Sequence, residues 1–160
     1  MPRLISRNIY RLPFSESLDI ARSPAPFHYK ERSDWYAIDF PMPIGTPIRA
    51  SLDGIVEEAE DGFSNGKLQK RFYDRCNYVC IAHKGGEHTM YAHLQRGISV
   101  KKDDYVRAGD IIGHSGLSGF TSYPHLHFYV ARLNRAGEEF TVLARFRKRK
   151  GIITLRSPKE

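Results

Sequence analysis

The sequence consists of short apolar or alternating runs separated by Gly, Pro, Asp and Asn, and no useful length of it has the periodicity of an amphipathic helix. The clearest runs are WYAIDF (35–40), GIVEEAE (54–60), NYVCIAHK (77–84), HTMYAHL (88–94) and HLHFYVAR (125–132). Regularly spaced strands bounded by turn residues are typical of a β-sandwich or barrel. The pattern therefore predicts an all-β fold. KGGE (84–87) is expected to form a tight hairpin between two strands.

The length of 160 residues is that of a single domain with a substantial core. Two long stretches, 11–34 and 61–75, are polar and have the composition of loops. Loops of this length in a compact β domain tend to border functional sites. No apolar run is long enough for a membrane span, and MPRLISRNIY lacks the apolar run of a signal peptide. We therefore expect no membrane span and no visible signal peptide.

The net charge of +7 is concentrated at the end of the chain. Residues 131–160 hold nine Lys or Arg against three Glu, and RFRKRK (145–150) lies at their centre. Such a patch is able to bind nucleic acid, an anionic membrane or an acidic polymer. It is equally consistent with a solvated edge that aids solubility.

The two cysteines, Cys76 and Cys80, are four residues apart in a segment with the pattern of a strand. Along a strand this separation is roughly 13 Å, whereas a disulfide tolerates about 7 Å between Cα atoms. We expect two free thiols and no zinc–thiolate site, since there is no CxxC spacing.

His125 and His127 flank Leu126 in the apolar run TSYPHLHFYV. In a strand both imidazoles point to the same side, while Leu126 points to the other. Two imidazoles on one face of a strand form either a metal or catalytic pair or an unusually polar core.

Other polar side chains in apolar surroundings are able to join this pair. Asp39 lies between Ile38 and Phe40, and a buried carboxylate needs a partner. His93 lies in MYAHLQ, and His28 lies in APFHYK before the run that carries Asp39. Zinc accepts imidazole nitrogen and carboxylate oxygen, and catalytic zinc sites use three protein ligands. Each residue taken singly also fits a structural role. His83, His88 and His114 are expected to be surface or structural residues.

His-x-His alone also occurs in other metal-binding folds. Cupins have a glutamate shortly after the pair, where this chain has Ala131 and Arg132. Metallo-β-lactamases have a further Asp-His, where this chain has Phe128 and Tyr129. Both alternatives are therefore disfavoured.

Four motifs together resemble one family. YAIDFPMPIGTPIRASLDGIV, NYVCIAHKGGEHTMYAHL, VRAGDIIGHSG and PHLHFYV follow one another as in the lysostaphin/LytM-like zinc metalloendopeptidases, which are peptidoglycan hydrolases. The resemblance covers roughly residues 28–130. It implies a duplicated-hybrid-motif β-sandwich or barrel of mainly antiparallel strands, with long loops that form a groove. On this basis the single domain 1–160 divides into an N-terminal extension (1–27), a catalytic core (28–130) and a basic C-terminal segment (131–160).

The resemblance also implies the site. The family holds zinc (Zn2+) with a histidine upstream of the DF aspartate, with that aspartate, and with the second histidine of His-x-His. These positions correspond to His28, Asp39 and His127. Many members place the upstream histidine four residues before the aspartate, where this chain has Trp35, but others place it farther back, and His28 is the only upstream histidine. His93 and His125 correspond to the family's non-ligand active-site histidines and are the expected catalytic pair.

The sequence departs from the family at two positions where glycine is usual. Tyr123 precedes Pro124, and Cys76 precedes Asn77. Both side chains are expected to narrow or reshape the substrate groove. Residues that could form the groove wall, or simply pack, are Tyr36, Phe63, Phe72 and Tyr73.

The expected function is zinc-dependent hydrolysis of peptide cross-links or stem peptides of peptidoglycan by metal-activated water. The alternative is a non-catalytic wall-binding or hydrolase-regulating module of the same fold. Peptidoglycan peptides are the expected partner, and anionic wall polymers are a second one through RFRKRK (145–150). A nucleic-acid partner is not expected, since only charge and scattered aromatics favour it. The substrate implies a cell-envelope or extracellular location.

Overall fold

A computed structural model describes residues 4–18, 20, 35–64, 75–119 and 121–155. The strands run in the order β1 (Ile5–Tyr10), β2 (Ile38–Pro41), β3 (Pro47–Arg49), β4 (Gly54–Glu60), β5 (Tyr78–His83), β6 (Glu87–Ala92), β7 (Tyr105–Val106), β8 (Ile111–His114), β9 (His125–Leu133), β10 (Glu139–Lys148) and β11 (Gly151–Thr154). The described residues contain no α-helix, only the 3-10 turn Lys84–Gly86. The all-β prediction is confirmed. In this part of the chain, no helix is long and apolar enough to cross a membrane.

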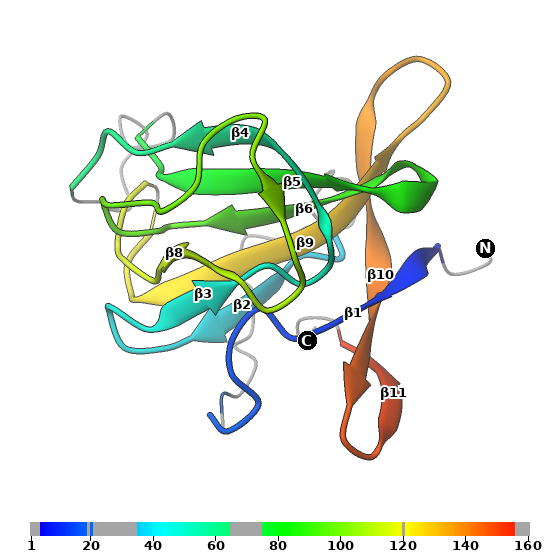
Figure 1. Cartoon of the computed structure of the whole chain (residues 1–160), viewed down its shortest axis with the longest axis horizontal. Helices are drawn as coiled ribbons and strands as arrows, with labels where there is room; N and C mark the ends of the chain where they lie inside the picture. Colours follow the sequence, from blue (N-terminus) through cyan, green and yellow to red (C-terminus); the bar gives the residue numbers. More distant parts are fainter. Residues whose placement is uncertain (1–3, 19, 21–34, 65–74, 120, 156–160) are drawn as a thin grey trace.

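Nine strands form one curled sheet. Seven of them follow the path β1-β10-β9-β6-β5-β4-β7, while β2 also pairs with β9 and β11 also pairs with β10. Only β1 and β10 pair in parallel, so the sheet is mainly antiparallel, as expected. A separate pair, β3 and β8, lies across this sheet (Figure 1). β5 and β6 are joined by the hairpin that the KGGE motif predicts.

The core lies between the large sheet and the β3–β8 pair. β9 contributes Leu126, Phe128 and Val130, which are all fully buried, and β3 and β8 contribute Ile48 and Ile112. Because side chains alternate along a strand, the residues between these apolar positions point to the opposite face of the sheet. That face carries His125, His127 and Tyr129.

A buried carboxylate fastens the first strand to the rest of the sheet. Glu87, at the start of β6, is 1 % exposed. Its two oxygens accept hydrogen bonds from the backbone N–H of Arg7 (2.6 Å) and of Asn8 (3.0 Å) and from the Tyr10 hydroxyl (2.9 Å). Since β1 pairs with β10, and β10 with β9, this carboxylate supports the strand that carries the two histidines.

Glu87→Ala is expected to lower the free energy of unfolding by about 3 kcal/mol, because it leaves buried donors of β1 without an acceptor. Glu60→Ala, at an exposed position of β4, is the matched control and should change stability by less than about 0.5 kcal/mol. Denaturant unfolding of both variants measures the difference. Equal stability of the two variants would contradict this role of Glu87.

Candidate active site

The pairing of β2 with β9 brings the aspartate and the two histidines together. Asp39 lies opposite His127, and Pro41 lies opposite His125. Oδ1 of Asp39 is 3.0 Å from Nδ1 of His127 and 3.6 Å from Nε2 of His125. The two rings therefore share one face of β9, as their spacing predicts, and both contact a carboxylate that is only 6 % exposed.

His93 joins the same cluster from the neighbouring strand. Its ring centroid lies 4.6 Å from that of His125 and 5.9 Å from that of His127. The sequence predicts His93 within a strand, but β6 ends at Ala92 and His93 follows it in the left-handed region, with φ 65°. Since few non-glycine residues adopt this conformation, it is a feature that neighbouring contacts must hold in place.

Backbone carbonyls fix the proton position on two of the rings. Nδ1 of His93 lies 2.6 Å from the Ser118 carbonyl oxygen, and Nδ1 of His125 lies 2.9 Å from that of Tyr123. A carbonyl oxygen only accepts, so each Nδ1 carries the proton and donates it. Nε2 of each ring is thereby left as an acceptor within the cluster.

Both rings are neutral near pH 7. Burial, together with the nearby His125 and His127, lowers the pKa of His93 to about 3. Burial also lowers the pKa of His125, although the charge of Asp39 acts in the opposite direction. Desolvation disfavours the imidazolium form. Two neutral imidazoles whose Nε2 atoms carry no proton are suited to accept one.

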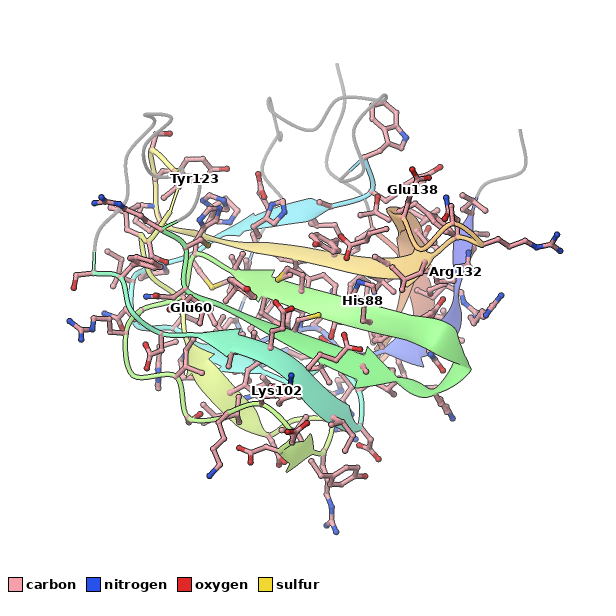
Figure 2. All side chains as sticks on the ribbon, turned by 90° about the horizontal axis from the view of Figure 1, so that it is seen from above. Glu60, His88, Lys102, Tyr123, Arg132 and Glu138 are labelled. Carbon is pink, nitrogen blue, oxygen red and sulfur yellow. The ribbon has the colours of Figure 1, made fainter. Side chains whose placement is uncertain are left out.

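Tyr123 covers one of these rings. Its ring stacks on His125, with centroids 4.4 Å apart and planes at 26°. The sequence predicts that Tyr123 reshapes the groove, and the structure shows a direct contact with the expected catalytic residue. Tyr123 lies at the end of the sheet where β9 begins, far from Arg132 and Glu138 at the other end (Figure 2).

A buried amide, which sequence reasoning missed, organises the segment around His93. Asn77 is fully buried. Its side chain accepts from the N–H of Phe63 (2.9 Å) and donates to the carbonyl oxygens of Phe63 and of Leu94 (3.1 Å for Leu94). Its own N–H donates to the Ser118 hydroxyl, at 2.9 Å. Asn77 thus connects both neighbours of the cluster, Leu94 and Ser118, with the loop at Phe63. The strand-like pattern of the sequence around Asn77 gives no indication of this role.

Cys76 contacts His93 from the same side. Its sulfur accepts the N–H of His93 at 3.2 Å, and it is a free thiol, as is Cys80. Both free-thiol predictions are confirmed, although Cys76 lies before β5 rather than within it. Burial raises the pKa of the Cys76 thiol, so it is a neutral structural contact. Gly119, at φ 82°, lies against it, where a Cβ would come within 2.8 Å of the Cys76 Cβ.

The donor set of Asp39 and His127 fits zinc. Zinc–nitrogen and zinc–oxygen bonds of about 2.0–2.2 Å at a tetrahedral angle separate two donors by roughly 3.3 Å. The separation of Oδ1 and Nδ1 is 3.0 Å, close to this value. Within the described residues, however, no group of three His, Cys, Asp or Glu side chains is arranged to hold a metal ion.

Not every predicted residue falls within the described part of the chain. His28, Phe72 and Tyr73 are outside the described residues. Tyr36 and Phe63 are partly buried.

The three remaining histidines take no part in the cluster. His83 is buried, with its ring nitrogens 2.8 Å from the Asp53 carbonyl oxygen and from the Thr89 hydroxyl. His88 lies 2.6 Å from a carboxylate oxygen of Glu139. His114 lies at the end of β8.

Comparison with known proteins identifies the family. The model of peptidase family M23 matches residues 33–139, which is more than half of the chain. The chain belongs to peptidase family M23. This M23 chain is 43% identical to lysostaphin of Staphylococcus simulans over 94 residues, covering 58% of this chain and 17% of lysostaphin. It is 40% identical to the peptidoglycan DD-endopeptidase ShyC of Vibrio cholerae over 90 residues, covering 56% of this chain and 18% of that protein.

A solved structure agrees with the family. The M23 chain superposes on a zinc-containing peptidase from Vibrio cholerae with a TM-score of 0.57 and 28% identity, over 77% of this chain and 36% of that one. The M23 chain thus spans less than a fifth of lysostaphin and of ShyC, and about a third of the solved peptidase.

Asn77→Asp is expected to lower the free energy of unfolding by about 2 kcal/mol, because it replaces the donor with a carboxylate facing the Phe63 and Leu94 carbonyls. The same change at Asn134, in the exposed turn between β9 and β10, is the control and should cost less than about 1 kcal/mol. Thermal unfolding of both variants measures this. If Asn77→Asp lowers the free energy of unfolding no more than Asn134→Asp does, the Asn77 amide does not stabilise the segment around His93.

Proposed function

We propose that this chain is a zinc-dependent endopeptidase that hydrolyses peptide cross-links or stem peptides of bacterial peptidoglycan. The observation that carries the proposal is the cluster itself. A buried carboxylate, Asp39, contacts His127 and His125, and His93 packs against both rings. Membership of the M23 family supports peptide hydrolysis.

Asp39 and His127 would hold the zinc ion, with His28 as the third protein ligand. The donor chemistry and the 3.0 Å separation of Asp39 Oδ1 and His127 Nδ1 support the first two. The resemblance of the sequence supports His28. When bound, zinc polarises the scissile carbonyl and lowers the pKa of a coordinated water. The zinc-containing peptidase of Vibrio cholerae supports the choice of metal.

His93 and His125 would move the protons. Nε2 of one ring accepts a proton from the attacking water, and the imidazolium so formed donates a proton to the leaving amine. The same imidazolium would donate a hydrogen bond to the oxyanion of the tetrahedral intermediate before it transfers its proton, while the other, neutral ring would accept a hydrogen bond from the attacking water through its Nε2. The Nδ1 hydrogen bonds to Ser118 and Tyr123 keep both rings oriented during these transfers. No Ser or Cys nucleophile and no covalent intermediate are needed.

The substrate class rests on the relatives. ShyC is named a peptidoglycan DD-endopeptidase, and lysostaphin is described as an antimicrobial peptidase. A peptidoglycan substrate places the site of action in the cell envelope or outside the cell.

Elemental analysis of zinc per chain tests the metal site. We expect about one zinc in the wild type and a clear loss in Asp39→Ala, His127→Ala and His28→Ala, because each removes one of three ligands. His88→Ala, outside the cluster, is the control and should keep its zinc. A wild type that stays metal-free after zinc loading would favour the non-catalytic module instead. Zinc retained in His28→Ala alone would show that another residue is the third ligand.

Hydrolysis assays separate the metal ligands from the proton-transfer residues. His93→Ala and His125→Ala are expected to keep zinc but lose about 10²–10⁴-fold in kcat, the usual contribution of general acid–base catalysis. The substrate is a soluble peptidoglycan peptide, and zinc is measured on the same samples. Wild-type activity in either variant would remove that residue from the mechanism.

A further inference from the structure

A cavity separate from the histidine cluster is lined by five cationic side chains. It has a volume of about 490 Å³. Its cations are Arg11, Arg49, Arg147, Lys148 and Arg149. The lining contains a single carboxylate, that of Glu16, so the cavity carries a net charge of about four positive units.

Four chain segments build this cavity, namely 11–16, Arg49, Gly109 and 147–149. Backbone hydrogen bonds join the first two. The N–H of Arg11 donates to the Ser51 carbonyl oxygen at 2.8 Å, and the N–H of Arg49 donates to that of Pro13 at 2.9 Å. The segment after β1 is thus fixed beside β3.

The fourth segment is the end of β10. The parallel pairing of β1 with β10 sets Tyr10 opposite Phe146, so the next residues, Arg11 and Arg147, lie at the same end of the two strands. β10 then turns into β11 through the exposed residues 149–150 (Figure 1). The positions of the cavity-lining residues are therefore set by strand pairing and backbone hydrogen bonds, and the cavity is more than an isolated basic segment.

Two guanidinium groups converge on one glycine. Nη1 of Arg49 donates to the Gly109 carbonyl oxygen at 2.9 Å. Nη1 of Arg11 lies 3.5 Å from the position that a Cβ on Gly109 would occupy. Two like charges brought to one place repel each other unless an anion lies between or beside them.

Within the described part of the chain, none of these five cations forms an ion pair with a carboxylate, since the ion pairs there all involve a histidine. Arg145, in the same RFRKRK run, provides a contrast. Its guanidinium donates to the carbonyl oxygens of Ser6 (3.0 Å) and Arg7 (2.6 Å), so it joins β10 to β1. Its neighbours Arg147, Lys148 and Arg149 are exposed and line the cavity instead.

The lining indicates which anion the cavity accepts. Guanidinium groups match phosphate geometry, and several of them favour a ligand with repeated phosphates. Proteins that bind single-stranded nucleic acid combine cations with aromatic rings on which the bases stack. The one aromatic residue among the lining residues, Phe14, is 4 % exposed and belongs to the core. The cavity therefore suits a phosphate chain without bases.

We propose that this cavity binds the phosphate groups of a linear anionic wall polymer and so holds the enzyme beside its substrate. The identity of the polymer as a wall component rests on the proposed function, whereas the anion site does not. The cavity assigns the polymer contact to Arg11 and Arg49 as well as to Arg147, Lys148 and Arg149 of the RFRKRK run.

Binding of a soluble poly(glycerol phosphate) chain at low ionic strength tests this. Arg147→Gln/Arg149→Gln is expected to bind about tenfold more weakly than the wild type, because two of the cations are lost. Lys101→Gln/Lys102→Gln removes the same charge from an exposed loop outside the cavity and should bind within about twofold of the wild type. Equal binding of poly(glycerol phosphate) by both double variants would show that the cavity is not the anion site.

Two further measurements separate this inference from the proposed function. An oligodeoxythymidylate with the same number of phosphates should bind no more tightly than the poly(glycerol phosphate) chain. Tighter binding of the oligonucleotide would overturn the assignment to a wall polymer. Hydrolysis of a soluble peptide should be equal in both double variants and the wild type, since neither change touches the histidine cluster. If the wild type hydrolyses no peptide but the variants show this binding pattern, the proposed peptidase function is wrong and the anion site stands.

Discussion

The register between β2 and β9 is the constraint on which the site depends. It sets Asp39 opposite His127, while the alternation along β9 directs Leu126 and Phe128 into the core. A slip of one residue would move every side chain of β9 to the other face. The fully buried apolar residues resist such a slip, because it would expose them and bury the histidines. The hydrophobic core therefore fixes the positions of the polar cluster.

Burial and charge compete within this cluster, and burial dominates. The carboxylate of Asp39 favours the charged form of His125, but loss of hydration lowers its pKa overall. His93 experiences the same desolvation together with two neighbouring imidazoles, and its pKa falls farther. Neutral rings are the form in which histidine binds metals and accepts protons. The strand surroundings thus supply the protonation state that the proposed chemistry needs.

The sequence predicted the parts that depend on local periodicity. The all-β fold, the shared face of His125 and His127, and the strand position of Asp39 all follow from alternation along single strands. The left-handed conformation of His93 and the hydrogen bonds of Asn77 depend on loops that meet across long separations in sequence. RFRKRK (145–150) was predicted as one basic patch. It divides in the structure because Arg145 donates to β1 and Phe146 is buried in the core, whereas residues 147–150 are exposed.

The family match and the folding unit have different boundaries. The M23 match spans 33–139, so it includes the whole of β9 but neither β1 nor the length of β10 beyond its first residue. Those two strands continue the sheet on one side of β9, and four hydrogen-bond donors of β1 surround the Glu87 carboxylate. A fragment trimmed to 33–139 would leave this carboxylate without its β1 donors, beside an uncovered sheet edge. We therefore expect the smallest stable form of this sheet to extend from β1 through β10, beyond the residues that match the family.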